Sequence, residues 1–186
     1  MVNSVKTFLK QVGKDYQNQS VNPPVVRAST IIFKTLQDIK KTQSNYKKNP
    51  LSKNFDYGRK GTSTTFALQK LLRKIENAYQ VYLTPTGFGA VFLGVISVVR
   101  PGDEIIITDS VYSPTRFLTE DYLKKFNIKA VFYDPKNLDD LKKKITNKTK
   151  LIFVENPGSN TFEFQDLKKI LSFAKNKNIY TAIDNT

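Results

Sequence analysis

Glycine, hydroxyl-bearing and acidic residues follow the ends of four predicted strands. The segments are residues 84–89, 109–112, 155–159 and 184–186. Ligands of open α/β sheets bind at the carboxyl ends of the strands. Chemistry is therefore to be sought in these four segments, provided that the strands are parallel.

The segment 84–89 reads Thr-Pro-Thr-Gly-Phe-Gly and leads into a predicted helix. Free backbone N–H groups and the dipole at a helix N-terminus attract anions such as phosphate. Gly87 has no side chain that could block a close approach. An ordinary strand-to-helix turn has the same local sequence, so both interpretations stand on the local residues.

Three further candidates have side chains suited to a flat, anionic ligand. Asp184 follows the apolar strand 179–183, where a carboxylate is costly unless it is paired. Its partner is either a protonated heterocyclic nitrogen or neighbouring backbone. Tyr112 can stack on a flat ring or simply fill space. Arg59 with Tyr57 suits phosphate recognition, because a guanidinium binds phosphate through paired hydrogen bonds, although a surface loop explains the pair equally well.

Alternating helices and strands predict the frame that positions these residues. Apolar residues at helical spacing predict helices, and short apolar runs predict five strands. Such alternation implies right-handed crossovers and a mainly parallel sheet, so the expected fold class is α/β. Segment 87–99 is too short to span a membrane and is expected to be a buried helix. The expected helices are 63–77, 87–99, 113–126, 138–145 and a long one through Phe164 and Ala174; the expected strands are 81–83, 104–108, 128–133, 150–154 and 179–183.

Residues 1–60 lack this regularity. A short amphipathic piece with Val5 and Phe8 ends at Gly13, and a polar stretch containing proline follows it. A loop rich in Lys and Asn then extends to residue 54. We expect an arm that lies over another surface.

Composition excludes several classes of site. The 186 residues contain no Cys and no His, which excludes disulfides, thiolate metal sites and the usual catalytic triads. The formal charge of +14 would suit nucleic acid or a membrane surface. The basic residues are dispersed over helix surfaces, however, so we expect neither partner and no metal. The N-terminus has no signal-peptide pattern, and we expect a cytoplasmic protein.

The order of the motifs is more specific than any one of them. From about residue 21 to residue 186, the chain resembles the trans-sulfuration family of pyridoxal-phosphate enzymes. The resemblance implies a partial aspartate-aminotransferase-like (fold type I) domain at 61–186, preceded by the arm 1–60. The motif that begins at Glu155, with Thr161 and Glu163 after it, is most similar to bacterial cystathionine β-lyase. The five motifs are Tyr57-Gly58-Arg59, Thr86-Gly87-Phe88, Asp109-Ser110-Val111-Tyr112, Glu155-Asn156-Pro157-Gly158-Ser159 and Ala182-Ile183-Asp184-Asn185-Thr186.

This resemblance implies pyridoxal 5'-phosphate (PLP) as the cofactor and assigns a role to each motif. Gly87 and Phe88 would offer backbone N–H groups to the phosphate; the family usually has Met in place of Phe88. Tyr112 would stack on the ring, and Asp184 would pair with the protonated ring nitrogen. Tyr57 and Arg59 would bind the phosphate of a neighbouring subunit's cofactor, so the arm would lie partly on a partner in a homo-oligomer, a dimer or tetramer.

The implied reaction is elimination from a small sulfur amino acid. Cystathionine would give homocysteine, pyruvate and ammonia. The family's Schiff-base Lys lies downstream of the Asp184 motif, beyond Thr186, so we expect a truncated chain that contains no catalytic Lys and is inactive alone. A γ-lyase or γ-synthase fragment, or a non-catalytic binder of the cofactor or of phosphate, remains the alternative.

Overall fold

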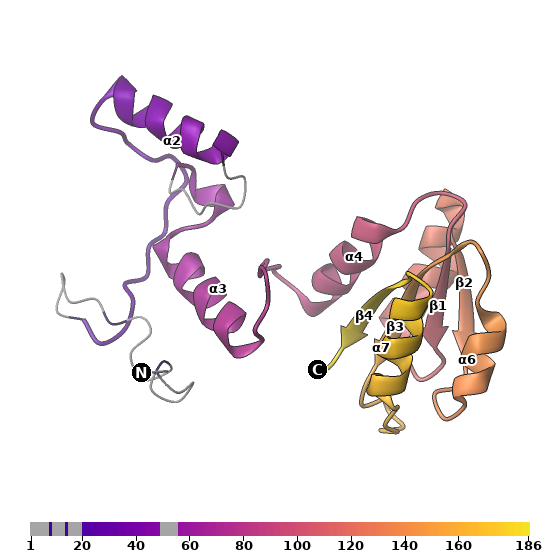
Figure 1. The fold of residues 1–186 in the computed structure, drawn as a ribbon. Helices are drawn as coiled ribbons and strands as arrows, with labels where there is room; N and C mark the ends of the chain where they lie inside the picture. Colours follow the sequence, from indigo (N-terminus) through magenta and orange to yellow (C-terminus); the bar gives the residue numbers. More distant parts are fainter. Residues whose placement is uncertain (1–7, 9–13, 15–19, 49–55) are drawn as a thin grey trace. The chain divides into compact units, whose positions relative to one another are not determined.

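The computed structural model describes residues 8, 14, 20–48 and 56–186, and it divides into two compact units, Met1–Leu83 and Thr84–Thr186. Figure 1 shows the first unit in indigo and magenta and the second from dark pink to yellow. Most of the expected amphipathic piece near the N-terminus lies outside the described residues. None of the described helices is long and apolar enough to cross a membrane.

The first unit contains a helix where the sequence analysis expected a loop. Helix α2 (Leu36–Lys48) begins after Thr35, whose hydroxyl accepts the Asp38 N–H at 3.2 Å, while the Asp38 carboxylate accepts the Thr35 N–H at 3.1 Å. This reciprocal cap satisfies two N–H groups at the helix start. The expectation was wrong because the helix has few apolar residues, which left its periodicity hard to see.

A short turn and a longer helix complete the first unit. The 3₁₀ turn η1 (Gly58–Lys60) precedes α3 (Ser63–Ile75), close to the expected helix 63–77. A Cβ built on Gly58 would lie 1.6 Å from the Ala28 carbonyl oxygen, so glycine is required where the two segments meet. Segment 81–83 pairs with no strand in the part of the chain that the structure describes, and the strand expected there was wrong.

The second unit is built on a four-stranded parallel sheet, which confirms the α/β expectation. Its strands occur in the spatial order β2-β1-β3-β4, with every neighbouring pair parallel. The carboxyl ends of all four strands therefore lie at one edge of the sheet. The strands are β1 (Glu104–Thr108), β2 (Lys129–Tyr133), β3 (Thr149–Glu155) and β4 (Tyr180–Asp184).

Helices pack on both faces of this sheet (Figure 1). One face packs against α4 (Gly87–Val98) and the helical run after β1, through a core that includes Val95, Ile105 and Phe153. The other packs against α6 (Leu138–Lys144) and α7 (Leu167–Asn176), through a core that includes Ile106 and Ile170. Because helices cover both faces of the sheet, the side chains on both sides of the central strands are buried, and these strands are apolar throughout.

Three helices differ from expectation in their detail. Within α4 itself only Val95 is fully buried, whereas Leu93 and Ile96 are exposed, so the helix is only partly buried. The helix expected at 113–126 is α5 (Ser113–Phe117), a π segment η2 (Leu118–Tyr122) and a 3₁₀ segment η3 (Leu123–Phe126). The Thr119 hydroxyl donates to two backbone carbonyl oxygens of the preceding turn, a competition that disturbs regular helix. Helix α7 begins later than Phe164, because Asp166 caps it.

Candidate functional site

The carboxyl ends of β3 and β4, the start of α4 and the loop before α5 surround one cavity of about 680 Å³. Four of the six predicted cofactor-binding residues line this cavity: Gly87, Phe88, Tyr112 and Asp184. The structure therefore brings together residues that are up to 97 positions apart in the chain. Its other lining residues are Thr86, Val91, Glu155, Pro157, Gly158, Ser159, Asn160, Phe162 and Thr186.

The N-terminus of α4 supplies hydrogen-bond donors to the cavity. Thr86 is the N-cap, and its hydroxyl oxygen accepts the Gly89 N–H at 3.0 Å. The N–H groups of Gly87 and Phe88, in the first turn, have no acceptor among the described residues, as is usual at a helix start. A Cβ built on Gly87 would meet no atom within 4 Å, so the space beside the Gly87 backbone is open. This arrangement is able to bind an anion.

Tyr112 is held at the cavity wall by its backbone. Its N–H donates to Glu155 Oε2 at 2.7 Å, and Tyr112 then caps α5, which has Pro114 in its first turn. Tyr112 is 46 % exposed and lines the cavity, so part of its side chain is accessible to a ligand.

Asp184 uses one carboxylate oxygen within its own turn. Its Oδ1 accepts the Thr186 N–H at 3.1 Å and the Thr186 hydroxyl at 2.6 Å. Its Oδ2 has no hydrogen-bond partner among the described residues. The two interpretations of Asp184 that the sequence left open are therefore compatible: one oxygen is bonded locally, and the other remains for a ligand.

Glu155 is a lining residue that the sequence analysis named only as part of a motif. It is nearly buried, and it is the Cα partner of Asp184 across the β3–β4 ladder. Burial raises the pKa of Glu155; the N–H of Tyr112 opposes that shift, and the negative charge of Asp184 adds to it. Its position at the end of a buried strand was a signal that could have identified it, because an acid in such a place needs a partner.

The loop between β3 and α7 closes one side of the cavity through tight contacts. The Ser159 N–H donates to the Ser110 carbonyl oxygen at 2.9 Å. A Cβ built on Gly158 would lie 2.7 Å from Ser110 Oγ, so only glycine allows this approach without a shift. Behind the loop, Gln165 is buried and bonds Thr108, Tyr133 and the Glu155 carbonyl oxygen. These contacts fix the cavity wall to β1, β2 and β3.

The other two predicted site residues, Tyr57 and Arg59, belong to the first unit. The Arg59 guanidinium carbon lies 5.2 Å from the centroid of the Tyr57 ring, a cation–π distance, and both side chains are exposed. They are therefore adjacent to each other and present a cation and a phenol to solvent.

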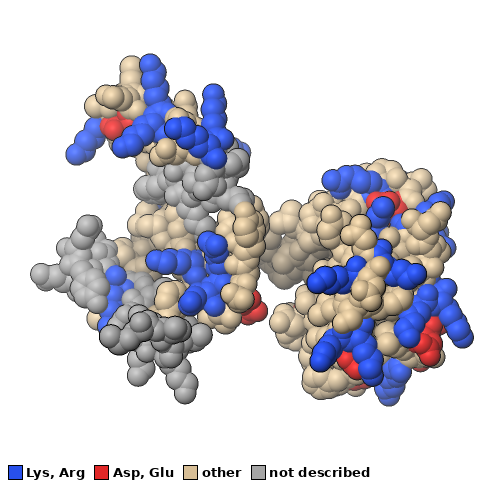
Figure 2. Space-filling model, in the orientation of Figure 1, with Lys and Arg blue, Asp and Glu red and all other residues tan. Residues whose placement is uncertain are grey.

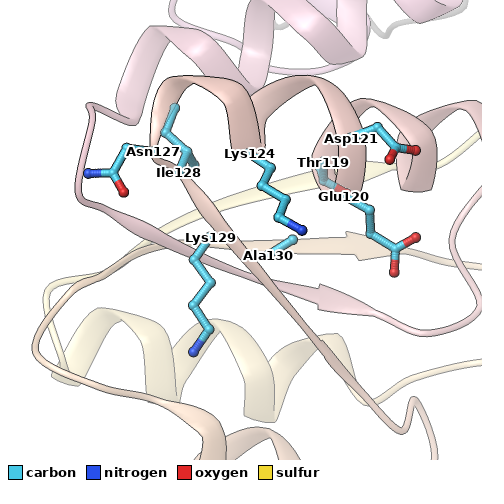
Figure 3. A pocket seen from close by; sticks show the side chains of 8 residues that line it. All are labelled: Thr119, Glu120, Asp121, Lys124, Asn127, Ile128, Lys129 and Ala130. Carbon is cyan, nitrogen blue, oxygen red and sulfur yellow. The ribbon is translucent and has the colours of Figure 1, made fainter.

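A second cavity of about 690 Å³ lies at the carboxyl ends of β1 and β2, and none of the six predicted site residues lines it. Figure 3 shows a hollow beside β2 in which Lys129 extends away from Lys124 and Glu120, so its charges do not converge. Lys129 also pairs with Glu104 at 3.2 Å. In Figure 2, Lys and Arg are spread over the visible face with Asp and Glu among them. The described residues contain no group of three or more acidic side chains able to hold a metal ion.

Comparison with known proteins gives a consistent match. The family model described as "Cys/Met metabolism PLP-dependent enzyme" matches residues 6–186. A cystathionine beta-lyase of Haemophilus influenzae is 37 % identical over 93 % of this chain and 43 % of its own length. A "Putative cystathionine beta-lyase" of Saccharomyces cerevisiae is 35 % identical over 98 % of this chain and 51 % of its own length. The chain thus spans about half the length of these curated relatives.

A solved structure from Campylobacter jejuni matches with a TM-score of 0.80 and 28 % identity, over 93 % of this chain and 41 % of that one. Its title describes a "putative O-acetylhomoserine (thiol)-lyase" that carries N'-pyridoxyl-lysine-5'-monophosphate.

Proposed function

The chain belongs to the family of Cys/Met metabolism PLP-dependent enzymes, and from that premise we propose that its cavity is the part of a PLP site that holds the phosphate and the ring nitrogen. The proposed enzyme cleaves the carbon–sulfur bond of cystathionine by β-elimination. One observation carries the proposal: the start of α4, Tyr112 and Asp184 come from separate elements and line the same cavity.

The residues present fit the chemistry of this cofactor. PLP is a flat pyridine with a phosphate at one end and a ring nitrogen that accepts a proton. The N–H groups of Gly87 and Phe88 suit the phosphate, and the free Oδ2 of Asp184 suits the protonated nitrogen. The half-exposed Tyr112 ring suits the face of the pyridine. The cavity of about 680 Å³ lies within the range of small-molecule sites.

When bound, PLP supplies a ring that withdraws electrons from the α-carbon of an amino acid. The residues of this chain support that role. The negative Asp184 keeps a proton on the ring nitrogen, which strengthens the withdrawal. The donors of α4 hold the phosphate and so orient the ring, and Tyr112 limits its tilt.

Tyr57 and Arg59 complete the proposal on a second subunit. Their adjacency and exposure suit a phosphate that approaches from outside their own unit. We assign them to the cofactor phosphate of a neighbouring subunit in a homo-oligomer, with residues 1–60 forming the arm that reaches it and residues 61–186 forming part of the cofactor domain.

The choice of β-elimination rests on two relatives named cystathionine beta-lyase. A γ-lyase or γ-synthase would use the same phosphate and ring-nitrogen contacts, so these contacts alone do not select the bond that is cleaved. The products do: β-elimination of cystathionine releases pyruvate, whereas cleavage on the γ side releases cysteine.

No Lys lines the described cavity. We propose that the Lys that would hold the cofactor covalently lies downstream of the Asp184 position in full-length members of the family. The 186-residue chain is therefore expected to bind the cofactor without turning over cystathionine. The test incubates the purified chain with PLP and cystathionine and measures pyruvate and cysteine. Binding is measured separately with pyridoxine 5'-phosphate, which has no aldehyde to react with Lys. Saturable binding without either product supports the proposal. Sustained release of pyruvate contradicts the expected lack of turnover, release of cysteine contradicts β-elimination, and a failure to bind contradicts the cofactor site.

A further inference from the structure

Two acidic side chains stand next to each other at the cavity rim. Glu155 and Asp184 are Cα partners at the carboxyl ends of the parallel strands β3 and β4, and both line the cavity. Neighbouring strands are about 4.8 Å apart, so two such side chains feel each other's charge. The Asn156 N–H donates to the Asp184 carbonyl oxygen at 3.0 Å and extends the pairing of the two strands past this position.

No cation compensates this pair within the residues that the structure describes. All seven described ion pairs use other carboxylates. The Glu155 carboxylate lies beside the negative Asp184 of β4 and accepts the Tyr112 N–H from the start of α5, whereas the Gln165 amide donates to the Glu155 backbone carbonyl oxygen. Two carboxylates with only neutral donors around them attract a positive charge from a ligand.

We infer that Glu155 is a positioning residue of this site, whose carboxylate adds a second negative charge beside Asp184 and so holds the proton on a bound pyridine nitrogen. The inference rests on the proposed function, since the ligand is the one proposed for the cavity. Asp184 contacts the nitrogen through its free Oδ2, while Glu155 acts through Asp184. The same side chain also holds the Tyr112 backbone by its 2.7 Å hydrogen bond.

The test uses pyridin-3-ylmethyl phosphate, which carries the phosphate arm and ring nitrogen but has no aldehyde to react with the many Lys residues. The pH at which the ring nitrogen of the bound ligand loses its proton is read from the ligand's ring-proton NMR shifts. In wild-type protein this midpoint should lie above that of the free ligand. Glu155→Gln should lower it by about one pH unit, because one neighbouring negative charge is lost.

Three variants separate charge from structure. Glu155→Asp keeps the charge and should keep the midpoint near the wild-type value, even though its shorter side chain weakens the bond to Tyr112. Asp184→Asn should lower the midpoint more than Glu155→Gln does. Glu120→Gln removes an exposed carboxylate outside the cavity and should change nothing.

The outcomes distinguish the inference from the proposed function. If Glu155→Gln keeps the wild-type midpoint while Asp184→Asn lowers it, the inference fails and the proposed function stands. If the midpoint of Glu155→Asp falls as far as that of Glu155→Gln, hydrogen-bond geometry accounts for the effect and the proposed role of the charge is overturned. If wild-type protein does not bind the ligand, both fail. If Glu155→Gln does not fold, Glu155→Asp tests the inference alone. A midpoint for Glu155→Asp as low as that of Asp184→Asn would then contradict it.

Discussion

Glu155 and Asp184 form the last paired position of the β3–β4 ladder, and they place two carboxylates side by side at the rim of a cavity. The cavity thus has a negative side at the strand ends and donor N–H groups at the start of α4. A ligand with a basic nitrogen and an anionic group matches that polarity.

The first prediction concerns the anion-binding helix start. Gly87→Ala adds a methyl group to the open space beside the first turn of α4, so affinity for pyridoxine 5'-phosphate should fall about tenfold. Gly94→Ala is the matched control, because its Cβ also meets no atom within 4 Å but lies later in α4. Calorimetric titration of both variants checks this. Equal affinities for the two would show that the phosphate does not approach Gly87.

The second prediction concerns the loop that closes the cavity. Gly158→Ala places a Cβ 2.7 Å from Ser110 Oγ and should lower the free energy of unfolding by about 1–3 kcal/mol. Adding Ser110→Gly removes the two nearest atoms, while Glu163 Oε2 stays 3.0 Å away, and should restore part of that loss. Urea denaturation of the single and double variants measures the coupling, and strictly additive losses would contradict the contact.

The third prediction concerns the buried amide behind the loop. Burial raises the pKa of Tyr133, although its interaction with Thr108 opposes the shift, so its hydroxyl stays neutral and donates to Gln165. Gln165→Leu leaves the Tyr133 hydroxyl and the Glu155 carbonyl without this partner, and stability should fall by about 2–4 kcal/mol. Gln37→Leu, on the exposed face of α2, should change stability by less than about 0.5 kcal/mol. Comparable losses in both would count against the network.

The fourth prediction concerns the pH dependence of stability. Since burial raises the pKa of Glu155, the folded protein holds this proton to higher pH than the unfolded chain does. Glu155 therefore contributes to the free energy of unfolding at low pH, and this contribution is lost as pH rises through its raised pKa. Glu155→Gln should remove that decline. Urea denaturation between about pH 4 and pH 7 compares the two proteins, and parallel profiles would show that Glu155 does not titrate in this way.

Much of the site could be predicted because a parallel sheet converts order along the chain into proximity. The rule that ligands bind at carboxyl ends of strands grouped the segments that contain Gly87, Tyr112 and Asp184, and the family resemblance then selected these residues, with Phe88, as cofactor contacts. The structure places all four along one cavity, and their role in holding a cofactor stays a prediction. No such rule connects Tyr57 and Arg59 to the cavity, because they belong to the other unit, and their role stays a prediction.

What the sequence did not predict depends on individual contacts. Helix α2 was missed because its stability at the N-terminus comes from Thr35 and Asp38 rather than from an apolar face. Glu155 was not selected because its significance comes from two partners, Tyr112 and Asp184, that are far from it in the chain. Residue spacing predicts the elements and the edge of the sheet, but it does not show which side chains pair across two strands.

The most direct test of the central claim is a calorimetric titration of wild-type protein and Asp184→Asn with pyridoxine 5'-phosphate, which has no aldehyde. The asparagine keeps an oxygen for the Thr186 N–H and hydroxyl but loses the charge, and hydrogen bonds to charged groups contribute about 1.5–3 kcal/mol. We predict one saturable site in wild-type protein, an affinity about 10- to 100-fold lower in Asp184→Asn, and no change in the control Asp121→Asn. Absence of binding in wild-type protein, or equal affinity in Asp184→Asn, would contradict the assignment of this cavity.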